Sequence, residues 1–97
     1  MVRIVSIEPA ANKKYKWTAT FDDGTHTSFG ATGYEDYTQH GDDERKRAYL
    51  SRHSRDLKTN DPRRAGYLSY YILWNKPTIE ESKRDFNRRF GSWKPKE

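Results

Sequence analysis

The pattern of apolar positions points to one central element, because uncharged apolar and aromatic residues run together only between residues 65 and 75. At helical spacing, Leu68, Ile72 and Leu73 share one face, and tyrosine and tryptophan side chains cover most of the remaining surface. A helix that is apolar nearly all round is normally buried by its neighbours. We therefore predict a core helix, and the length of the run and Pro62 before it argue against a strand.

The N-terminal part of the chain instead follows the two-residue period of strands. A β-branched run over residues 3–9 predicts a first strand in which Ile4 and Ile7 face opposite sides. Alternation over residues 15–21 predicts a half-buried second strand, and residues 25–29 return as its partner. An Asp-Asp-Gly-Thr turn joins these two strands, because glycine supplies the positive φ that a tight reversal needs. We expect a three-stranded antiparallel meander.

Polar residues and glycines then dominate until a second amphipathic stretch begins. Residues 29–41 predict a loop that buried tyrosines pin to the fold, with one helical turn at residues 36–40. The loop lacks a phosphate-binding pattern, and its acidic residues would repel an anion. Asp42 or Asp43 can cap a helix over residues 44–57, because a carboxylate accepts hydrogen bonds from the free N–H groups of a first turn.

The last helical region begins at Thr78, where Thr78 and Glu81 have the spacing of a capping box. Apolar residues at helical spacing continue this helix to Phe90. The whole pattern predicts an α+β fold, in which an N-terminal three-stranded antiparallel β-meander precedes three short α-helices in one compact domain. We expect this domain to span residues 1–91 and a flexible basic tail to span residues 92–97.

Composition and charge add two constraints to this pattern. Apolar residues make up 32% of the chain and charged residues 34%, so the 14% of aromatic residues must supply much of the buried area. Charge is uneven, since residues 1–43 carry four Lys and Arg against seven Asp and Glu, whereas residues 44–97 carry fifteen against seven. The basic second part favours an acidic partner, either nucleic acid or an acidic face of another protein.

Residue types exclude or disfavour several kinds of chemistry. Without cysteine the chain has no disulfide, no cysteine-ligated zinc and no thiol catalysis. No apolar run approaches the roughly 20 residues that cross a bilayer, so we expect a soluble, unsecreted protein without membrane insertion. No nucleophile elbow or catalytic triad pattern is visible either, which disfavours hydrolase activity.

Histidine is the other candidate for catalysis or metal binding. His26, His40 and His53 fall on a predicted strand, loop and helix, and they lack the spacing of metal ligands. Each acidic pair has a simpler explanation as a turn, a loop or a helix cap. We therefore predict a non-enzymatic protein with no catalytic residue, no metal and no cofactor. A metal-dependent nuclease using His40, His53 and nearby acids is the least favoured alternative.

Arginines on the two basic helices are the best candidates for contacting a partner, because arginine and exposed aromatic residues are enriched at interfaces. Pairing of these arginines with acids of the domain itself is the alternative. Trp93 stands alone among charged residues in the predicted tail. The predicted partner-binding residues are Arg45, Arg47, Arg52, Arg55, Arg84, Arg88, Arg89 and Trp93.

Several ordered motifs lie between residues 29 and 90. They are Phe29-Gly30 with Gly33-Tyr34-Glu35-Asp36-Tyr37-Thr38 and His40, Arg45-Lys46 with Tyr49 and Arg52-His53, Ala65-Gly66-Tyr67-Leu68-Ser69, and Ile72-Leu73-Trp74-Asn75-Lys76-Pro77-Thr78-Ile79. Together they resemble a family of small basic proteins of uncharacterised function encoded by large icosahedral double-stranded DNA viruses. The resemblance implies a viral setting, brings no catalytic residues and leaves the N-terminal hairpin outside its range.

Taken together, these features predict a small minor capsid or cement-type protein that binds other virion proteins. Its location would be the virion and, during assembly, the interior of the host cell. The surplus of aromatic residues predicts an oligomer or a hetero-assembly, in which a partner covers part of the aromatic surface. The alternative function is nucleic-acid binding, with the arginine-rich helices contacting phosphates.

Overall fold

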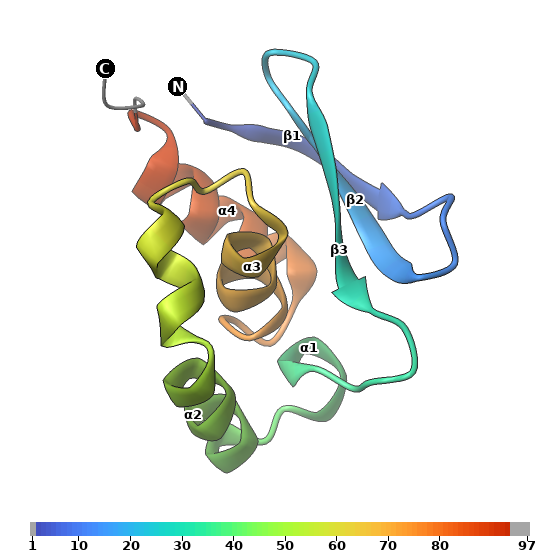
Figure 1. Ribbon diagram of the computed structural model, residues 1–97, viewed down its shortest axis with the longest axis vertical. Helices are drawn as coiled ribbons and strands as arrows, with labels where there is room; N and C mark the ends of the chain where they lie inside the picture. Colours follow the sequence, from blue (N-terminus) through green and yellow to red (C-terminus); the bar gives the residue numbers. More distant parts are fainter. Residues whose placement is uncertain (1, 94–97) are drawn as a thin grey trace.

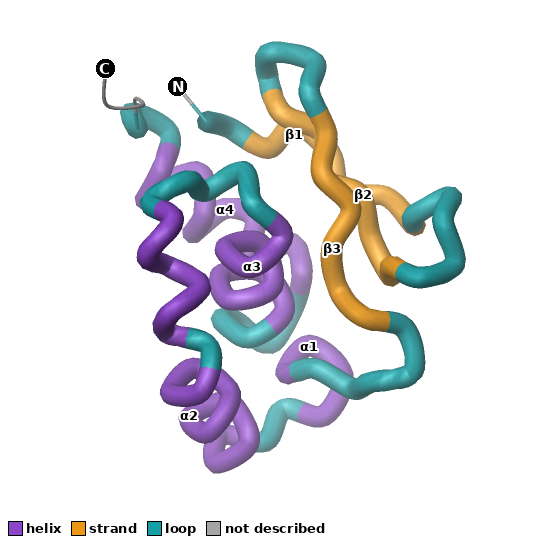
Figure 2. The backbone as a smooth tube through the Cα atoms, viewed as in Figure 1, coloured by secondary structure: helices purple, strands orange, loops and turns teal. Residues whose placement is uncertain are grey.

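Strands and helices occupy separate parts of the chain and separate layers of the molecule. The computed structural model describes residues 2–93, in which a three-stranded sheet packs against a layer of helices (Figure 1, Figure 2). This arrangement confirms the predicted α+β fold. The elements are β1 (Ile4–Pro9), β2 (Tyr15–Phe21), β3 (His26–Ala31), α1 (Tyr37–His40), α2 (Asp43–Arg52), the 3₁₀ helix η1 (Ser54–Thr59), α3 (Ala65–Leu68), the π-helix η2 (Ser69–Leu73) and α4 (Ile79–Phe90).

The sheet is the meander that the alternating pattern predicts. Its strands follow in the order β1-β2-β3, and both neighbouring pairs are antiparallel. Ala19 and Phe21 of β2 and Phe29 of β3 are buried, so these side chains form the core face of the sheet. Gly24 has a φ of +86° in the turn between β2 and β3, which is the conformation expected of that glycine.

A β-bulge in β1 corrects the prediction for the first strand. The register between β1 and β2 shifts after Ile4, so that Ile4 lies opposite Phe21 and Ile7 lies opposite Ala19. Ile7 therefore packs against the core on the same side as Ile4, and the prediction that they face opposite sides was wrong. Val5 lies within the shifted segment and is 56% exposed. One extra residue in a strand reverses the side-chain alternation beyond that residue. The pattern of apolar residues in the sequence does not reveal where such a residue is inserted.

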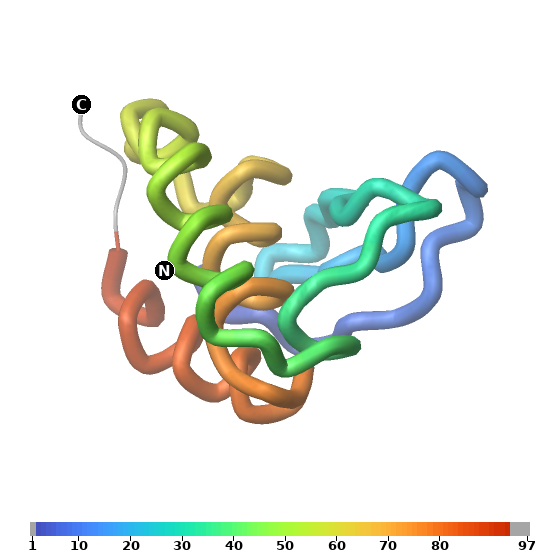
Figure 3. The backbone as a smooth tube through the Cα atoms, turned by 90° about the horizontal axis from the view of Figure 1, so that it is seen from below, coloured from blue at the N-terminus to red at the C-terminus, as the bar shows by residue number. Residues whose placement is uncertain are grey.

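The predicted core helix is confirmed, and it lies at the centre of the helical layer. Viewed from below, α3 and η2 lie between α2 and α4 (Figure 3). Leu68 and Ile72 are fully buried. The second half differs from the prediction, because the N–H of Trp74 donates to the carbonyl of Ser69 at 3.2 Å, the five-residue spacing of a π-helix. Within residues 2–93, no helix has the length and apolar character needed to cross a membrane.

Helix α2, which precedes the core segment in the chain, is shorter than the predicted helix over residues 44–57. Asp42 caps α2 by accepting from the N–H groups of Glu44 and Arg45, as expected, but α2 ends at Arg52 and a 3₁₀ helix follows. Polar side chains explain the break, because they offer the backbone local hydrogen bonds that compete with a continuous α-helix. The hydroxyl of Ser54 donates to the carbonyl of Ser51 at 3.2 Å.

One amide side chain joins the first strand to the last helix. The N–H of Ile4 donates to Oδ1 of Asn87 at 2.7 Å, and Nδ2 of Asn87 donates back to the carbonyl of Ile4 at 3.1 Å. The amide therefore pairs with the free edge of β1 as a neighbouring strand would. An edge strand otherwise presents unpaired N–H and C=O groups to solvent or to other chains.

Removing this amide should destabilise the fold. We expect Asn87→Ala to lower the free energy of unfolding by about 1–3 kcal/mol, because two partly buried backbone groups of Ile4 lose their partners. Urea unfolding followed by circular dichroism measures the change. Arg84→Ala is the matched control on the same helix, because Arg84 is exposed, and it should change stability by less than about 0.5 kcal/mol. Equal stabilities of the two variants would contradict the proposed role of Asn87.

Candidate binding site beside helix α2

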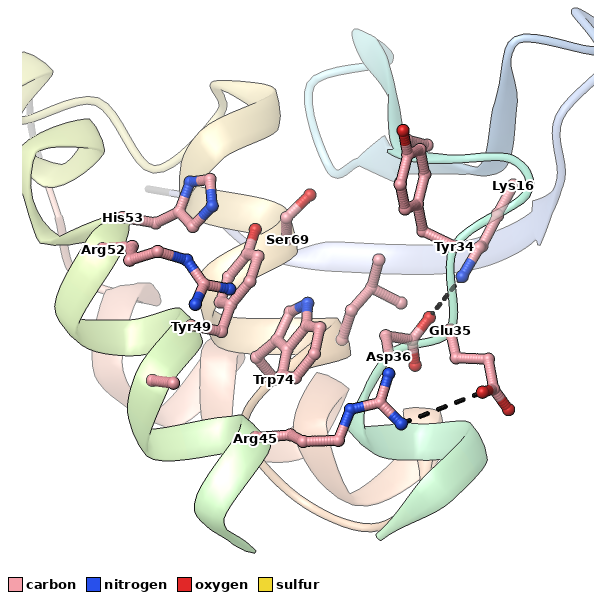
Figure 4. A pocket seen from close by; sticks show the side chains of 14 residues that line it. Lys16, Tyr34, Glu35, Asp36, Arg45, Tyr49, Arg52, His53, Ser69 and Trp74 are labelled. Atoms are coloured by element: carbon pink, nitrogen blue, oxygen red, sulfur yellow. Dashed lines mark hydrogen bonds and ion pairs between the residues drawn. The ribbon is translucent and has the colours of Figure 1, made fainter. Parts of the chain in front are cut away.

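A cleft of about 610 Å³ opens between α2, the π-helix η2 and the loop after β3 (Figure 4). Arg45, Tyr49 and Arg52 line it from α2. These residues are spaced by four and three positions, so one face of the helix presents all three. The volume falls within the range of roughly 300–1,000 Å³ that is typical of ligand pockets. The cleft is therefore a candidate for a ligand-binding site.

A column of four aromatic rings forms one wall of this cleft. Tyr49 stacks on His53 at a centroid distance of 4.1 Å and on Trp74 at 4.2 Å, with the latter two ring planes only 5° apart. The ring of His40 lies 5.2 Å from that of Trp74 and is tilted by 57°. Both faces of Tyr49 are covered, and burial raises the pKa of its hydroxyl. Only the ring edges of the column are left to contact a ligand.

Those edges carry hydrogen-bonding groups. Figure 4 shows the hydroxyls of Tyr49 and Ser69 and the indole nitrogen of Trp74 directed toward the same part of the cleft. Among the described residues, Nε1 of Trp74 has no hydrogen-bond acceptor. The π-helical hydrogen bond between Ser69 and Trp74 sets the relative position of these two residues. π-helical turns are rare in proteins, and those that occur are frequently found at functional sites.

An ion pair fixes the opposite wall of the cleft. Nζ of Lys16 lies 2.8 Å from Oδ2 of Asp36, and the Asp36 side chain is 3% exposed. Asp36 also caps α1, because its Oδ1 accepts from the N–H of Thr38 at 3.0 Å, and Gln39 completes a capping box by accepting from the N–H of Asp36. Asp36 is thus a structural acid, in agreement with its interpretation as a loop residue. Lys46 also has a partner within the domain, because its Nζ donates to the main-chain carbonyl of Asn75 at 2.6 Å.

The predicted arginines of the second helical region separate into two groups. Arg45 and Arg52 lie at the cleft, whereas Arg47 on α2 and Arg55 on η1 are exposed and do not line it. Arg45 is 3.8 Å from Glu35, and both side chains are at least half exposed, so this contact is weak. Arg52, Arg47 and Arg55 have no carboxylate partner within the described part of the chain.

On α4, two of the three predicted arginines are engaged inside the domain. Arg88 and Arg89 both donate to Asp85, whose side chain is buried, and Asn75 donates to the same carboxylate at 2.6 Å. Burial would raise the pKa of Asp85, but the hydrogen bonds from Arg89, Asn75 and Arg88 outweigh it and hold the pKa at about 2. Arg84 is exposed and has no carboxylate partner among residues 2–93.

Trp93 and the histidines complete the predicted candidates. Trp93 is partly buried and packs against the hydrophobic core, while residues 94–97 of the predicted tail lie outside the described residues. His40 and His53 lie at the two ends of the aromatic column, with Trp74 and Tyr49 between them. The two imidazoles therefore cannot share one metal ion. Within residues 2–93, no group of three or more potential ligands is placed to hold a metal.

Sequence reasoning missed several residues of the cleft because they come from distant elements. Lys16, Tyr34, Ser69 and Trp74 lie on β2, a loop and the core segment, and only the folded chain brings them together. The spacing of Arg45, Tyr49 and Arg52 is a local signal, because it allows one face of a helix to present all three. It does not show which elements that face adjoins.

Comparison with known proteins places the chain in a family. A family model described as a family of unknown function (DUF5754) matches residues 5–53, which is half of the chain. The chain belongs to this family. The match to DUF5754 extends from β1 to the end of α2, so it includes the sheet that the resemblance noted from the sequence left out. No curated protein and no solved structure matches the chain.

The carboxylate of Asp85 should make part of the stability sensitive to acid. Because its pKa in the folded chain lies below the ordinary value of 3.8, its contribution is complete above that value and is lost as the pH falls toward about 2. We expect the free energy of unfolding to fall by on the order of 2 kcal/mol between about pH 5 and pH 2. Urea unfolding at a series of pH values measures this loss.

Asp85→Asn should flatten that acid dependence and lower stability at neutral pH, because Arg88 and Arg89 lose their ionised partner. Asp22→Asn serves as the control, since Asp22 is exposed in the hairpin turn. An acid dependence of Asp85→Asn as steep as that of the unchanged chain would refute the role of Asp85.

Proposed function

We propose that the protein is a non-enzymatic structural component of a large icosahedral double-stranded DNA virus, a small minor capsid or cement-type protein that binds other virion proteins. The viral setting is supported by the ordered motifs between residues 29 and 90. Binding to protein is supported by the composition of the cleft, in which arginine, tyrosine and tryptophan border one concave surface. These residue types are enriched at the centres of protein interfaces.

The observation that carries the proposal is the stacked column beside Arg45 and Arg52. Single-stranded nucleic acid binds to proteins largely by stacking its bases on free aromatic faces. In this cleft Tyr49 and Trp74 are stacked on each other, and His53 stacks on the other face of Tyr49. Trp74 is only 9% exposed, and the tilted ring of His40 lies 5.2 Å from it. A protein segment, by contrast, can use ring edges, arginine donors and apolar contacts together.

Nucleic-acid binding is the second candidate, and the exposed arginines favour it. Arg47, Arg55 and Arg84 are free to contact phosphates. Against it, Asp42, Asp43 and Glu44 occupy the start of α2, so the phosphates of a duplex laid along this helix would meet acidic residues next to basic ones. The protein partner is therefore the better supported of the two.

The location can be tested on purified virions of the virus that encodes the chain. Nuclease-treated virions, fractionated with mild detergent and salt, should contain the protein in the fraction that holds the capsid shell. Mass spectrometry of the fractions provides the measurement. A fully assembled, infectious virion preparation that lacks the protein would refute the structural role.

A salt titration with duplex DNA separates the two candidates. A protein that contacts phosphates loses affinity with a log-log slope of about −0.9 per phosphate contacted. We expect the purified chain to bind duplex DNA weakly at low salt and to show no more than about one or two phosphate contacts. Fluorescence anisotropy of a labelled duplex at four salt concentrations gives the slope. A slope of about −5 or steeper would favour nucleic acid as the partner.

A further inference from the structure

Among the acidic and arginine or lysine residues that line the cleft, one positive charge is left uncompensated. Lys16 is neutralised by the buried Asp36 at 2.8 Å, and Arg45 lies in a loose contact with Glu35. Arg52 lines the cleft without a carboxylate partner among the described residues. A ligand with a single negative charge fits this balance. A phosphate monoester, which carries up to two negative charges, would meet Glu35 at the same opening.

The hydrogen-bonding groups of the cleft point to the same conclusion. Arg52 and the indole N–H of Trp74 can only donate hydrogen bonds, and the hydroxyls of Tyr49 and Ser69 can donate as well. On the side of the cleft formed by α2 and η2 these groups can all donate, whereas the acceptor Glu35 lies on the loop after β3. A carboxylate group is an acceptor with two oxygens, and the planar guanidinium of arginine matches it in geometry.

The rest of the lining is apolar. Leu73, Ala48 and Ala31 line the cleft between the charged groups, so the bound group must carry an apolar portion beside its charge. Tyr34 lies at the opening of the cleft and is 74% exposed, so its ring is free to cover a bound segment. Figure 4 places Tyr34 across the cleft from Tyr49 and Trp74.

We propose that the cleft binds a short segment of a partner protein in which an acidic residue stands next to an apolar residue. The carboxylate accepts hydrogen bonds from Arg52 and from Nε1 of Trp74, and the apolar side chain packs on Leu73 below Tyr34. This inference rests on the proposed function, because it takes the partner to be a protein. It adds the chemical class of the segment and the residues that select it.

Peptide titration of the full-length chain tests the proposal. The probe is a blocked Leu-Glu-Leu-Glu peptide, and its control is the same peptide with glutamine in place of glutamate. The readout is the nitrogen-15 NMR signal of each tryptophan indole N–H, with the Trp74 signal identified by its loss in Trp74→Phe. The Trp74 signal should shift with the glutamate peptide, and the glutamine peptide should bind at least about tenfold more weakly.

Two arginine variants show whether the cleft or the overall charge is responsible. Arg52→Gln should weaken binding of the glutamate peptide about tenfold or more, because a charge-assisted hydrogen bond is lost. Arg47→Gln makes the same charge change on the same helix but outside the cleft, and should weaken binding less than about twofold. Trp74→Phe keeps one aromatic ring in the column but removes the indole N–H together with the rest of the pyrrole ring, so it should weaken binding by an intermediate factor. A peptide-induced shift confined to Trp17 or Trp93 would overturn the proposed site.

Other outcomes would also overturn it. Equal losses for Arg52→Gln and Arg47→Gln would show that the peptide responds to net charge alone. Displacement of the peptide by inorganic phosphate or by a single-stranded oligonucleotide at lower concentration than the peptide itself would assign the cleft to a phosphate ligand. Presence in virions together with no peptide binding would refute only the cleft inference, whereas peptide binding without presence in virions would refute only the virion role.

Discussion

Burial of the α3 and η2 segment between the sheet and the flanking helices is the interaction on which the other contacts depend. Leu68 and Ile72 are fully buried within it, and each side chain of this size contributes about 1.5–3 kcal/mol when it is removed from water. The segment also meets β3 closely, because a Cβ on Gly30 would lie 2.9 Å from Cδ1 of Leu73. Gly30 has a φ of +82°, which residues with a side chain rarely adopt. Glycine at this position therefore lets the strand approach the core segment.

The core segment and the cleft are coupled through a single change in helical geometry. In an α-helix the N–H of Trp74 would donate to the residue four positions earlier, whereas here it donates to Ser69, five positions earlier. The wider turn leaves Trp74 at the end of the segment, stacked on Tyr49 of α2, while Ile72 is buried in the core. The segment thus serves both the core and the cleft. A π-helical turn, which is rare, therefore lies where the core segment meets the cleft.

The sequence predicted the features that have local causes. Alternation predicted the sheet, the uncharged run predicted the core helix, and Asp42 predicted the start of α2, because each depends on residues close in the chain. The bulge after Ile4 and the early end of α2 were missed, because they depend on one extra residue and on competing local hydrogen bonds. The cleft was missed for a different reason. Its residues come from β2, α2 and η2, and their proximity is a property of the packed chain.

Net charge along the sequence is a poor guide to where an acidic partner can bind. The basic second part of the chain contains cations that acids of the domain already hold, such as Arg89 on the buried Asp85 and Arg63, whose Nη2 lies 3.1 Å from Asp23 in the hairpin turn. Helical spacing allows Asp85 and Arg89 to pair. In the folded chain, the hydrogen bonds from Arg89, Asn75 and Arg88 hold the pKa of this acid low, although burial alone would raise it. A cation is available to a partner when its own domain has not already paired it. It can also confer selectivity when it adjoins a hollow lined with donors. Arg52 meets both conditions, whereas Arg88 and Arg89 fail the first, and this difference places the expected contact on α2 rather than on α4.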